Sequence, residues 1–155
     1  MREAYLHASL SKDPRTKIGA VLIQEDSIIS TGFNGFPRKV FDYEDRYLDK
    51  EIKYQFICHA EANAVTAAAR LGNRTNRATL VTQGIPCAEC CKTLIQAGIK
   101  AFVTHKQWPN LTHSPKWVES IEITKQMMAE AEIRHYVVDK VLGCAGFLDG
   151  KEIQV

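Results

Sequence analysis

The sequence lacks any apolar run of 18 or more residues, which excludes a conventional membrane-spanning helix. It also lacks a basic segment followed by an apolar one at the N-terminus, so we expect neither secretion nor a membrane partner and assign the chain to the cytoplasm. No internal repeat or low-complexity tract appears. The 155 residues are therefore most simply one domain, with a core over residues about 5–139 and a C-terminal tail over 140–155.

A marked excess of one charge is also absent. The chain has 20 Lys and Arg against 18 Asp and Glu, for a formal net charge of +2. Proteins that wrap a polyanion need a stronger basic bias, so we expect no nucleic-acid partner, although a small phosphorylated ligand needs only a few local cations. Apolar and charged fractions of 45% and 25% are those of an ordinary soluble globular protein.

The hydrophobic pattern predicts alternating strands and helices. Apolar runs at 18–23 and 28–33 predict an antiparallel hairpin that turns at Asp26 and Ser27. Further strands are expected at 78–82, 101–104 and 133–138, and helices at 1–11, 59–71, 87–97 and 117–132. Right-handed crossovers then give a three-layer α/β/α fold with a five-stranded mixed sheet. In this sheet the front hairpin is antiparallel, the remaining strands are parallel, and helices cover both faces.

Two segments have less regular patterns. Residues 38–56 are polar, aromatic and mixed in charge, and we expect a loop with a short helix that lies over the functional site. Residues 141–155 contain three glycines and no regular period, so the sequence leaves open whether this tail packs on the domain or on a partner.

Five cysteines, an odd number, lie in the chain, and two of them follow a pattern suited to a metal. Cys87 and Cys90 have the i, i+3 spacing that lets both sulfurs face one point, and His59 adds an imidazole. In a chain without a leader, such a cluster favours metal over disulfides. Cys58 and Cys91 are more simply buried small apolar residues.

Three protein ligands leave the fourth position of a zinc ion open for water, as in catalytic rather than structural sites. A zinc-bound water has a pKa of about 7. Two alternatives remain: a structural zinc site with a fourth ligand from Cys58 or Cys91, or a redox Cys-x-x-Cys pair next to an unrelated histidine.

Glu61 follows His59 by two residues, near enough to reach such a water without being needed as a ligand. A carboxylate there can take a proton from the water and pass it to a ring nitrogen and a leaving amine. The alternative is a first-turn glutamate that only favours the helix dipole.

On these residues the chain resembles the cytidine deaminase superfamily, and within it the deoxycytidylate (dCMP) deaminases. The resemblance is carried by Cys58-His59-Ala60-Glu61 and Pro86-Cys87-Ala88-Glu89-Cys90, and by three further segments at 11–20, 32–37 and 95–99. It implies that His59, Cys87 and Cys90 bind one Zn²⁺ and that Glu61 transfers protons. The implied reaction is attack of zinc hydroxide on C4 of cytosine in dCMP, a hydrolysis that yields dUMP and ammonia.

The resemblance also implies substrate contacts. Asn34 is expected to hold the sugar hydroxyl, whereas composition alone favours a turn residue there, and the backbone N–H of Ala60 is expected to hold the base carbonyl. Pro86 belongs to the same expected substrate site. Trp108 is expected either to stack on the base or to be a core or interface residue. Cationic candidates for a phosphate or effector are Arg15, Lys17, Arg38 and Lys106.

Family members are often homo-oligomers, dimers or hexamers, regulated by dCTP and dTTP with Mg²⁺. Here Phe36, Arg38 and Lys39 depart from the pattern of the effector loop, and the 38–56 segment has no His or Cys for a second zinc. Alternative functions are deamination of cytidine, cytosine, guanine or tRNA adenosine, or a non-catalytic zinc-stabilised binding module. Retention of Glu61 argues against the last of these.

Overall fold

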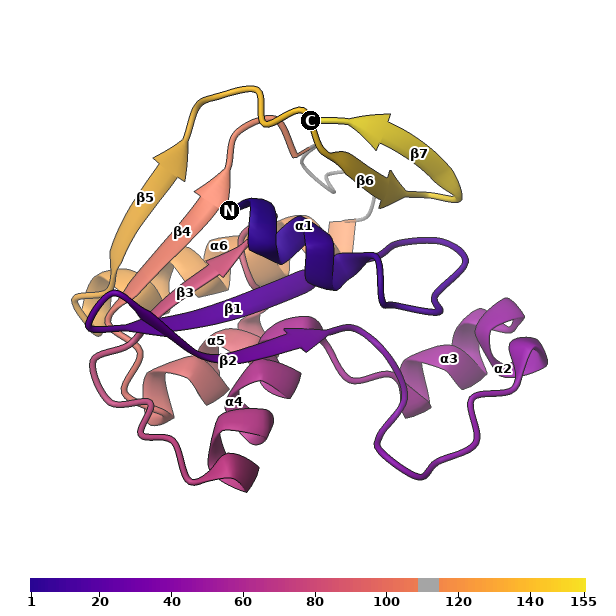
Figure 1. The fold of residues 1–155 in the computed structure, drawn as a ribbon, viewed down its shortest axis with the longest axis horizontal. Helices are drawn as coiled ribbons and strands as arrows, with labels where there is room; N and C mark the ends of the chain where they lie inside the picture. Colours follow the sequence, from indigo (N-terminus) through magenta and orange to yellow (C-terminus); the bar gives the residue numbers. More distant parts are fainter. Residues whose placement is uncertain (109–114) are drawn as a thin grey trace.

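The computed structural model describes residues 1–108 and 115–155, and a mixed sheet forms its centre (Figure 1). Its five strands lie in the order β2-β1-β3-β4-β5. The bounds are β1 Gly19–Gln24, β2 Ser27–Phe33, β3 Thr79–Thr82, β4 Ala101–His105 and β5 Arg134–Val138. β1 pairs antiparallel with both β2 and β3, and β3, β4 and β5 are parallel. The predicted mixed sheet is confirmed.

The front hairpin turns through two residues in the left-handed region. Glu25 and Asp26 have φ of 49° and 61°, the combination that matches the twist of the flanking strands. The turn therefore lies one residue earlier than the predicted Asp26–Ser27 connection.

Helices cover both faces of the sheet, as expected. On one face lie α4 (Ala60–Leu71), α5 (Ala88–Gln96) and α6 (Pro115–Glu130). The largest apolar cluster joins them to the strands through side chains such as Leu22, Leu80, Leu94 and Phe102. α1 (Arg2–Ala8) lies on the opposite face over β1 (Figure 1). No helix in the described part of the chain is long and apolar enough to span a membrane.

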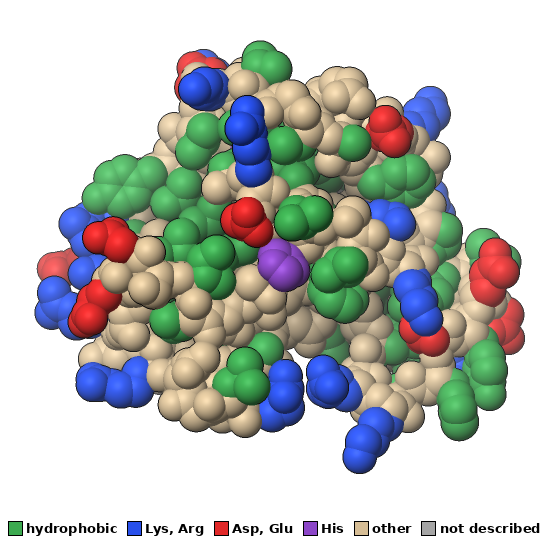
Figure 2. Space-filling view, viewed as in Figure 1, with side chains coloured by type: hydrophobic (Ala, Val, Ile, Leu, Met, Phe, Trp, Pro, Cys, Tyr) green, Lys and Arg blue, Asp and Glu red, His purple; other side chains and the backbone are tan. Residues whose placement is uncertain are grey.

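Beyond α1, the second face of the sheet is only partly covered. Figure 2 shows apolar side chains gathered in the left half of the view, over the strands that α1 leaves open. Tyr136 of β5 is 50% exposed, and Val103 of β4 is partly buried in a small cluster with Val21 and Val81. On this face, α1 therefore covers only the part of the sheet around the start of β1, and no helix in the described part of the chain lies over the strands beyond it.

The helix ends follow the expected chemistry. His59 and Cys87 are the N-cap residues of α4 and α5, both with extended backbone. Gly72 and Gly98 follow the two helices with φ of 76° and 77°, a conformation that glycine adopts without strain. Predicted and observed ends agree within one or two residues.

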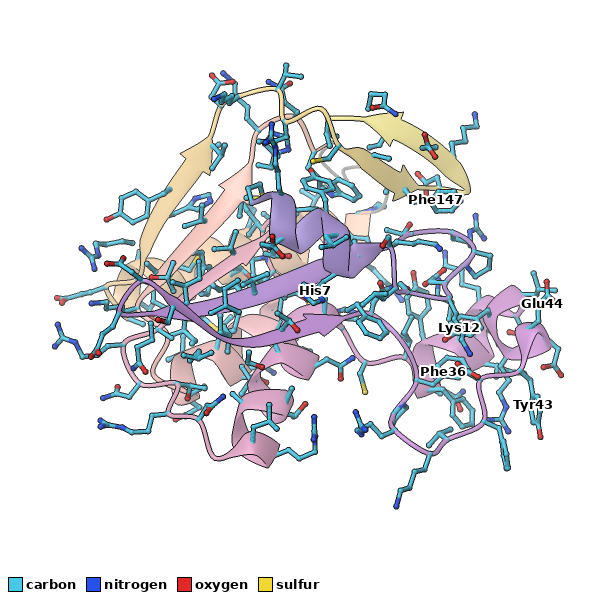
Figure 3. All side chains as sticks on the ribbon, viewed as in Figure 1. His7, Lys12, Phe36, Tyr43, Glu44 and Phe147 are labelled. Atoms are coloured by element: carbon cyan, nitrogen blue, oxygen red, sulfur yellow. The ribbon has the colours of Figure 1, made fainter. Side chains whose placement is uncertain are left out.

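Residues 38–56 form two short helices, α2 (Glu44–Leu48) and α3 (Lys50–Phe56), which project from one end of the sheet (Figure 1). Phe36 stacks on Tyr47 with ring centroids 4.3 Å apart, and Lys12 pairs with Asp42 at 2.9 Å. In Figure 3, Lys12, Phe36, Tyr43 and Glu44 all lie on this side of the molecule.

The tail, for which the sequence predicted no regular structure, forms a second small sheet. β6 (Ala145–Leu148) and β7 (Lys151–Gln154) pair antiparallel and pack on the domain itself. Leu148 and Val155 are buried against Tyr5 and Trp108 in a second apolar cluster. Near Phe147, labelled in Figure 3, the Lys17 N–H donates to the Phe147 carbonyl at 3.0 Å. The hairpin is thereby attached to the loop before β1.

Candidate metal centre and adjoining cavity

The side chains of His59, Cys87 and Cys90 converge on one point. Nδ1 of His59 lies 3.3 Å from Sγ of Cys87 and 3.4 Å from Sγ of Cys90. The three donor atoms all lie within 4.8 Å of one another. Tetrahedral zinc with Zn–N of about 2.0 Å and Zn–S of about 2.3 Å separates its ligand atoms by about 3.5 Å. The donor set and its spacing therefore fit a zinc ion.

Local structure explains why the two thiols meet the imidazole. His59 and Cys87 precede the first turns of neighbouring helices, and Cys90 lies one turn into α5. The Cys90 N–H donates to Sγ of Cys87 at 3.5 Å, so the sulfur caps the helix. Free N–H groups and the helix dipole at these positions favour a thiolate, which is the form that binds zinc.

The protonation of the three groups is coupled. Hydrogen bonds from the Cys90 thiol and from His59 lower the pKa of Cys87 to about 4. The resulting thiolate, together with burial, raises the pKa of Cys90. The hydrogen bond to Cys87 raises the pKa of His59 against the opposing effect of burial. Donors that share protons in this way are groups that zinc deprotonates on binding.

Glu61 lies beside this cluster without belonging to it. Its Oε2 is 3.9 Å from Sγ of Cys90, and only 7% of the residue is exposed. Burial raises the pKa of its carboxyl group, because a charged carboxylate is poorly solvated there. A buried carboxyl group with a raised pKa, next to a metal site, is suited to taking up and releasing a proton during a reaction.

A cavity of about 170 Å³ opens next to the centre. Thr82, Gly84 and Ile85 line it where β3 ends, and His59, Ala60 and Glu61 line it at the start of α4. The rest of the wall comes from the loop before β1, the end of β2, α3, the start of α5, α6, the β6–β7 turn and the residue after the β4 turn. These residues are Asp13, Thr16, Ile18, Asn34, Lys53, Tyr54, Ile57, Cys87, Trp108, Trp117 and Asp149. The cavity thus lies at the carboxyl ends of parallel strands, where open α/β sheets place ligands.

Asn34 lies on the cavity wall with its side chain fixed. Its Oδ1 accepts from the Ile18 N–H at 2.8 Å, and its Nδ2 donates to the Thr16 carbonyl at 2.8 Å and to Oδ2 of Asp13 at 3.2 Å. Both amide protons are used, so a ligand hydroxyl can approach Asn34 only as a donor to Oδ1. Ala60 also lines the cavity, at the first turn of α4 where backbone N–H groups have no partner within the helix.

The two alternatives for Trp108 are compatible. Trp108 is 5% exposed, packs against Tyr5 with centroids 6.0 Å apart and also lines the cavity. Pro86 lies outside the lining, and its carbonyl accepts from the Thr124 hydroxyl at 3.0 Å. Its place is therefore the packing between α5 and α6.

None of the four expected cations lines the cavity. Lys106 pairs with Asp139 at 2.6 Å on the surface, and the Lys17 ammonium lies 5.5 Å from the centroid of the Phe147 ring. The Arg15 backbone N–H donates to Oδ1 of Asp13 at 2.9 Å, and Arg38 is exposed. In the described part of the chain, Lys53 is the one Lys or Arg on the cavity wall.

Sequence reasoning missed four lining residues that carry chemistry: Asp13, Lys53, Trp117 and Asp149. The Trp117 ring, in the first turns of α6, lies 6.3 Å from the His59 ring and within 18° of parallel to it. Asp149 comes from the β6–β7 turn, which no pattern in the tail predicted. Lys53 could have been suspected from the sequence, because it belongs to the 38–56 segment that was expected to lie over the site.

Comparison with known proteins finds a zinc-binding family over the part of the chain that contains the three donors. Residues 1–106 match the model of the cytidine and deoxycytidylate deaminase zinc-binding region. The chain is 35% identical over 130 residues to an uncharacterized deaminase of Aliivibrio fischeri, with 84% of each protein covered. It is 34% identical over 111 residues to human deoxycytidylate deaminase. This match covers 66% of the chain described here and 60% of the human protein. The chain thus spans about three fifths of that enzyme.

Among solved structures, the dCMP deaminase of cyanophage S-TIM5, crystallised with dCMP and dUMP, superposes with a TM-score of 0.68. It is 24% identical, and the superposition covers 88% of this chain and 92% of the phage chain. This likeness supports the fold described above.

Proposed function

Because the chain belongs to the cytidine and deoxycytidylate deaminase family, we propose that it hydrolyses dCMP to dUMP and ammonia. The observation that carries this proposal is the three-donor cluster of His59, Cys87 and Cys90 with the buried carboxyl group of Glu61 on the wall of the same cavity. The human and phage proteins to which it is similar are dCMP deaminases, which supports the choice of substrate.

His59 Nδ1 and the two sulfurs would hold the zinc ion. A zinc ion with three protein ligands has a position open for water and lowers the pKa of that water to about 7. Glu61 accepts a proton from the attacking water and delivers it to N3 of the ring; it then takes the proton of the hydroxyl group added at C4 and delivers it to the amine that leaves C4. The C4–N bond breaks as the C4=O bond forms, so water is divided between product and ammonia.

The remaining wall residues orient the base and the sugar. The Ala60 N–H donates to the base carbonyl at the start of α4, where the helix dipole also favours negative charge. Oδ1 of Asn34 accepts from the sugar hydroxyl, the one contact that its existing hydrogen bonds allow. Trp108 and Trp117 supply apolar surface to the cavity and exclude water from it.

The test of this function is a substrate panel. Purified protein with zinc is incubated with dCMP, CMP, deoxycytidine and cytosine, and ammonia release is measured. We expect the highest kcat/KM for dCMP. Equal or faster turnover of an unphosphorylated compound would contradict the assignment of dCMP as the substrate and favour deamination of a nucleoside or a free base. No turnover of any of these, with zinc bound, would favour the binding-module alternative.

Regulation and assembly remain predictions of the family likeness. Addition of dCTP or dTTP with Mg²⁺ to the same assay tests for nucleotide effectors, and a flat response to both would remove that idea. Light scattering of the protein as it elutes from a size-exclusion column measures its mass and tests for the expected dimer or hexamer.

A further inference from the structure

Lys53 and Asp13 form a buried ion pair on the cavity wall. Nζ of Lys53 lies 2.6 Å from Oδ2 of Asp13, and the two side chains are 9% and 1% exposed. Every other ion pair among the described residues joins side chains that are at least 40% exposed. Removing two charges from water is costly, and a buried pair is often no more stabilising than apolar residues of the same size. Stability alone therefore gives a weak reason for a lysine at this position.

The two members of the pair differ in how fully they are bonded. Asp13 accepts four hydrogen bonds: Oδ1 from the N–H groups of Arg15 and Thr16, and Oδ2 from Lys53 and Asn34. The carboxylate thus has no capacity left for a ligand. The Lys53 ammonium has three N–H groups, and Asp13 is its one acceptor among the described residues. Two donors therefore remain for a molecule in the cavity.

The position of Lys53 indicates which part of a ligand it meets. Lys53 and Asn34 donate to the same oxygen of Asp13, so the ammonium lies next to the Asn34 side chain. Asn34 is the residue assigned above to the sugar hydroxyl. Glu61 and the metal ligands, which act on the amine end of the base, make no hydrogen bond to Asp13, Asn34 or Lys53 among the described residues. Lys53 is therefore placed at the sugar end of the substrate.

We propose that Lys53 determines specificity for a 5′-monophosphate, by donating charge-assisted hydrogen bonds to the phosphate of the nucleotide while Asp13 holds its ammonium in place. This inference rests on the proposed function for the identity of the base. Arg15, Lys17, Arg38 and Lys106 do not line the cavity, so among the residues that the structure describes Lys53 is the one Lys or Arg on its wall that can neutralise an anionic substrate group. Its place on α3 gives the 38–56 segment a role in substrate choice.

The competing explanation is that Lys53 only ties α3 to the loop that contains Asp13. The two explanations predict different substrate dependence. Loss of a structural tie impairs phosphorylated and unphosphorylated ligands alike, whereas loss of a phosphate contact impairs only the phosphorylated one.

The experiment compares Lys53→Met, Asp13→Asn and the Asp13→Asn/Lys53→Met double variant with the zinc-loaded wild type. Values of kcat/KM are measured for dCMP and deoxycytidine, and affinities for dUMP and deoxyuridine by calorimetry. We expect Lys53→Met to lower kcat/KM for dCMP and affinity for dUMP about 10- to 100-fold, the usual effect of charged hydrogen bonds, with less than about threefold change for the nucleosides. Lys125→Met, an exposed lysine paired with Glu122 on α6, is the matched control and should change neither.

The double variant covers the case in which Lys53→Met leaves Asp13 unpaired and the chain fails to fold. It contains no buried charge at the pair, so it should fold and still lack phosphate preference, whereas Asp13→Asn should retain that preference. An equal loss for nucleotide and nucleoside in the foldable variants overturns the proposal, as does a wild type that binds dUMP no better than deoxyuridine. Lys53-dependent binding of dUMP without turnover of dCMP would support the phosphate contact and contradict the proposed function. Turnover of dCMP, with the preference for nucleotide over nucleoside unchanged in the Lys53 variants, would support the proposed function and contradict the phosphate contact.

Discussion

At the scale of single residues, Cys87 and Cys90 differ from the other three cysteines in what they face. Their sulfurs lie against Nδ1 of His59. Cys91 is fully buried toward the carbonyl of Thr124, and Cys58 and Cys144 are half-buried elsewhere. Neighbours in sequence therefore have different roles, because successive side chains at the start of a helix point in different directions.

This contrast predicts the metal content of cysteine variants. Cys87→Ser and Cys90→Ser should each lower bound zinc from about one per chain to a small fraction of that, because zinc prefers the thiolate to a hydroxyl group. Cys58→Ser and Cys144→Ser should keep the full amount. Metal analysis after dialysis measures all four, and a Cys90→Ser protein that retains zinc would contradict the three-donor site.

A second prediction concerns Glu61. Glu61→Gln keeps the shape and the hydrogen bonds of the side chain but cannot accept a proton, so turnover should fall about 10²- to 10⁴-fold. Zinc content should stay the same, since Glu61 is outside the donor cluster. Glu89→Gln is the control, because this exposed first-turn glutamate of α5 pairs only with Lys92. Full activity in Glu61→Gln would end its assignment as the proton carrier.

At the scale of elements, the position of α4 depends on the absence of a side chain in β2. A Cβ on Gly32 would collide with the carbonyl of Ala60 and with the backbone N of Ala64. The helix that approaches β2 so closely is the one whose first turn places Ala60 and Glu61 on the cavity wall. Gly35, three residues on, has only ordinary contact with the Phe33 ring at 3.9 Å.

Gly32→Ala should therefore displace the first turn of α4 and destabilise the protein by about 1–3 kcal/mol, the usual cost of overpacking. Zinc affinity should fall as well, because His59 precedes that turn. Denaturant unfolding and a zinc competition titration measure the two effects. Gly35→Ala should change the free energy of unfolding by less than about 0.5 kcal/mol. Similar behaviour of both variants would show that close packing at Gly32 is not needed.

Elements were predictable where the chain marks them locally. Helices α4 and α5 are followed by terminal glycines, and the alternation of strands and helices predicted that β3, β4 and β5 are parallel. The β6–β7 hairpin was missed because its strands have four residues each, and beyond their mutual pairing they join the rest of the described chain through a single bridge between Phe147 and Lys17. Its burial comes from Tyr5 and Trp108, far away in sequence, so no period within the tail could reveal it.

The same distinction applies to the site. His59, Glu61, Cys87 and Cys90 stand in two short motifs and could be named from them. Lys53 and Asp149 reach the cavity only through the packing of α3 and of the tail, and most surface lysines and aspartates look the same in sequence. The four expected cations lie outside the cavity lining, and their contact with a phosphate or effector stays a prediction, because charge can be read from the sequence but the surface that a charged side chain faces cannot.

At the scale of the whole molecule, the two larger apolar clusters have different structural roles. The larger one holds the helices against the sheet, and the second one packs α1 and the β6–β7 hairpin around Trp108, a residue of the cavity wall. Leu148→Ala should destabilise the protein by about 2–5 kcal/mol and raise KM, because its side chain is buried in the second cluster. Val141→Ala, at a residue 71% exposed, is the control for stability. Unfolding and steady-state kinetics on both variants measure this, and an unchanged Leu148→Ala would argue against a structural role for the hairpin.

The contact between α1 and the segment before β6 has a consequence for the order of folding. Nε of Arg2 donates to the carbonyl of Leu142 at 3.1 Å, across 140 positions of the chain. Contacts of such long range incur a large loop-closure entropy and form late, whereas the β1–β2 hairpin is local and can form early. Trp108, which packs against Tyr5 of α1 and lines the cavity, should therefore reach its final surroundings late, and refolding should end in a slow phase seen in tryptophan fluorescence.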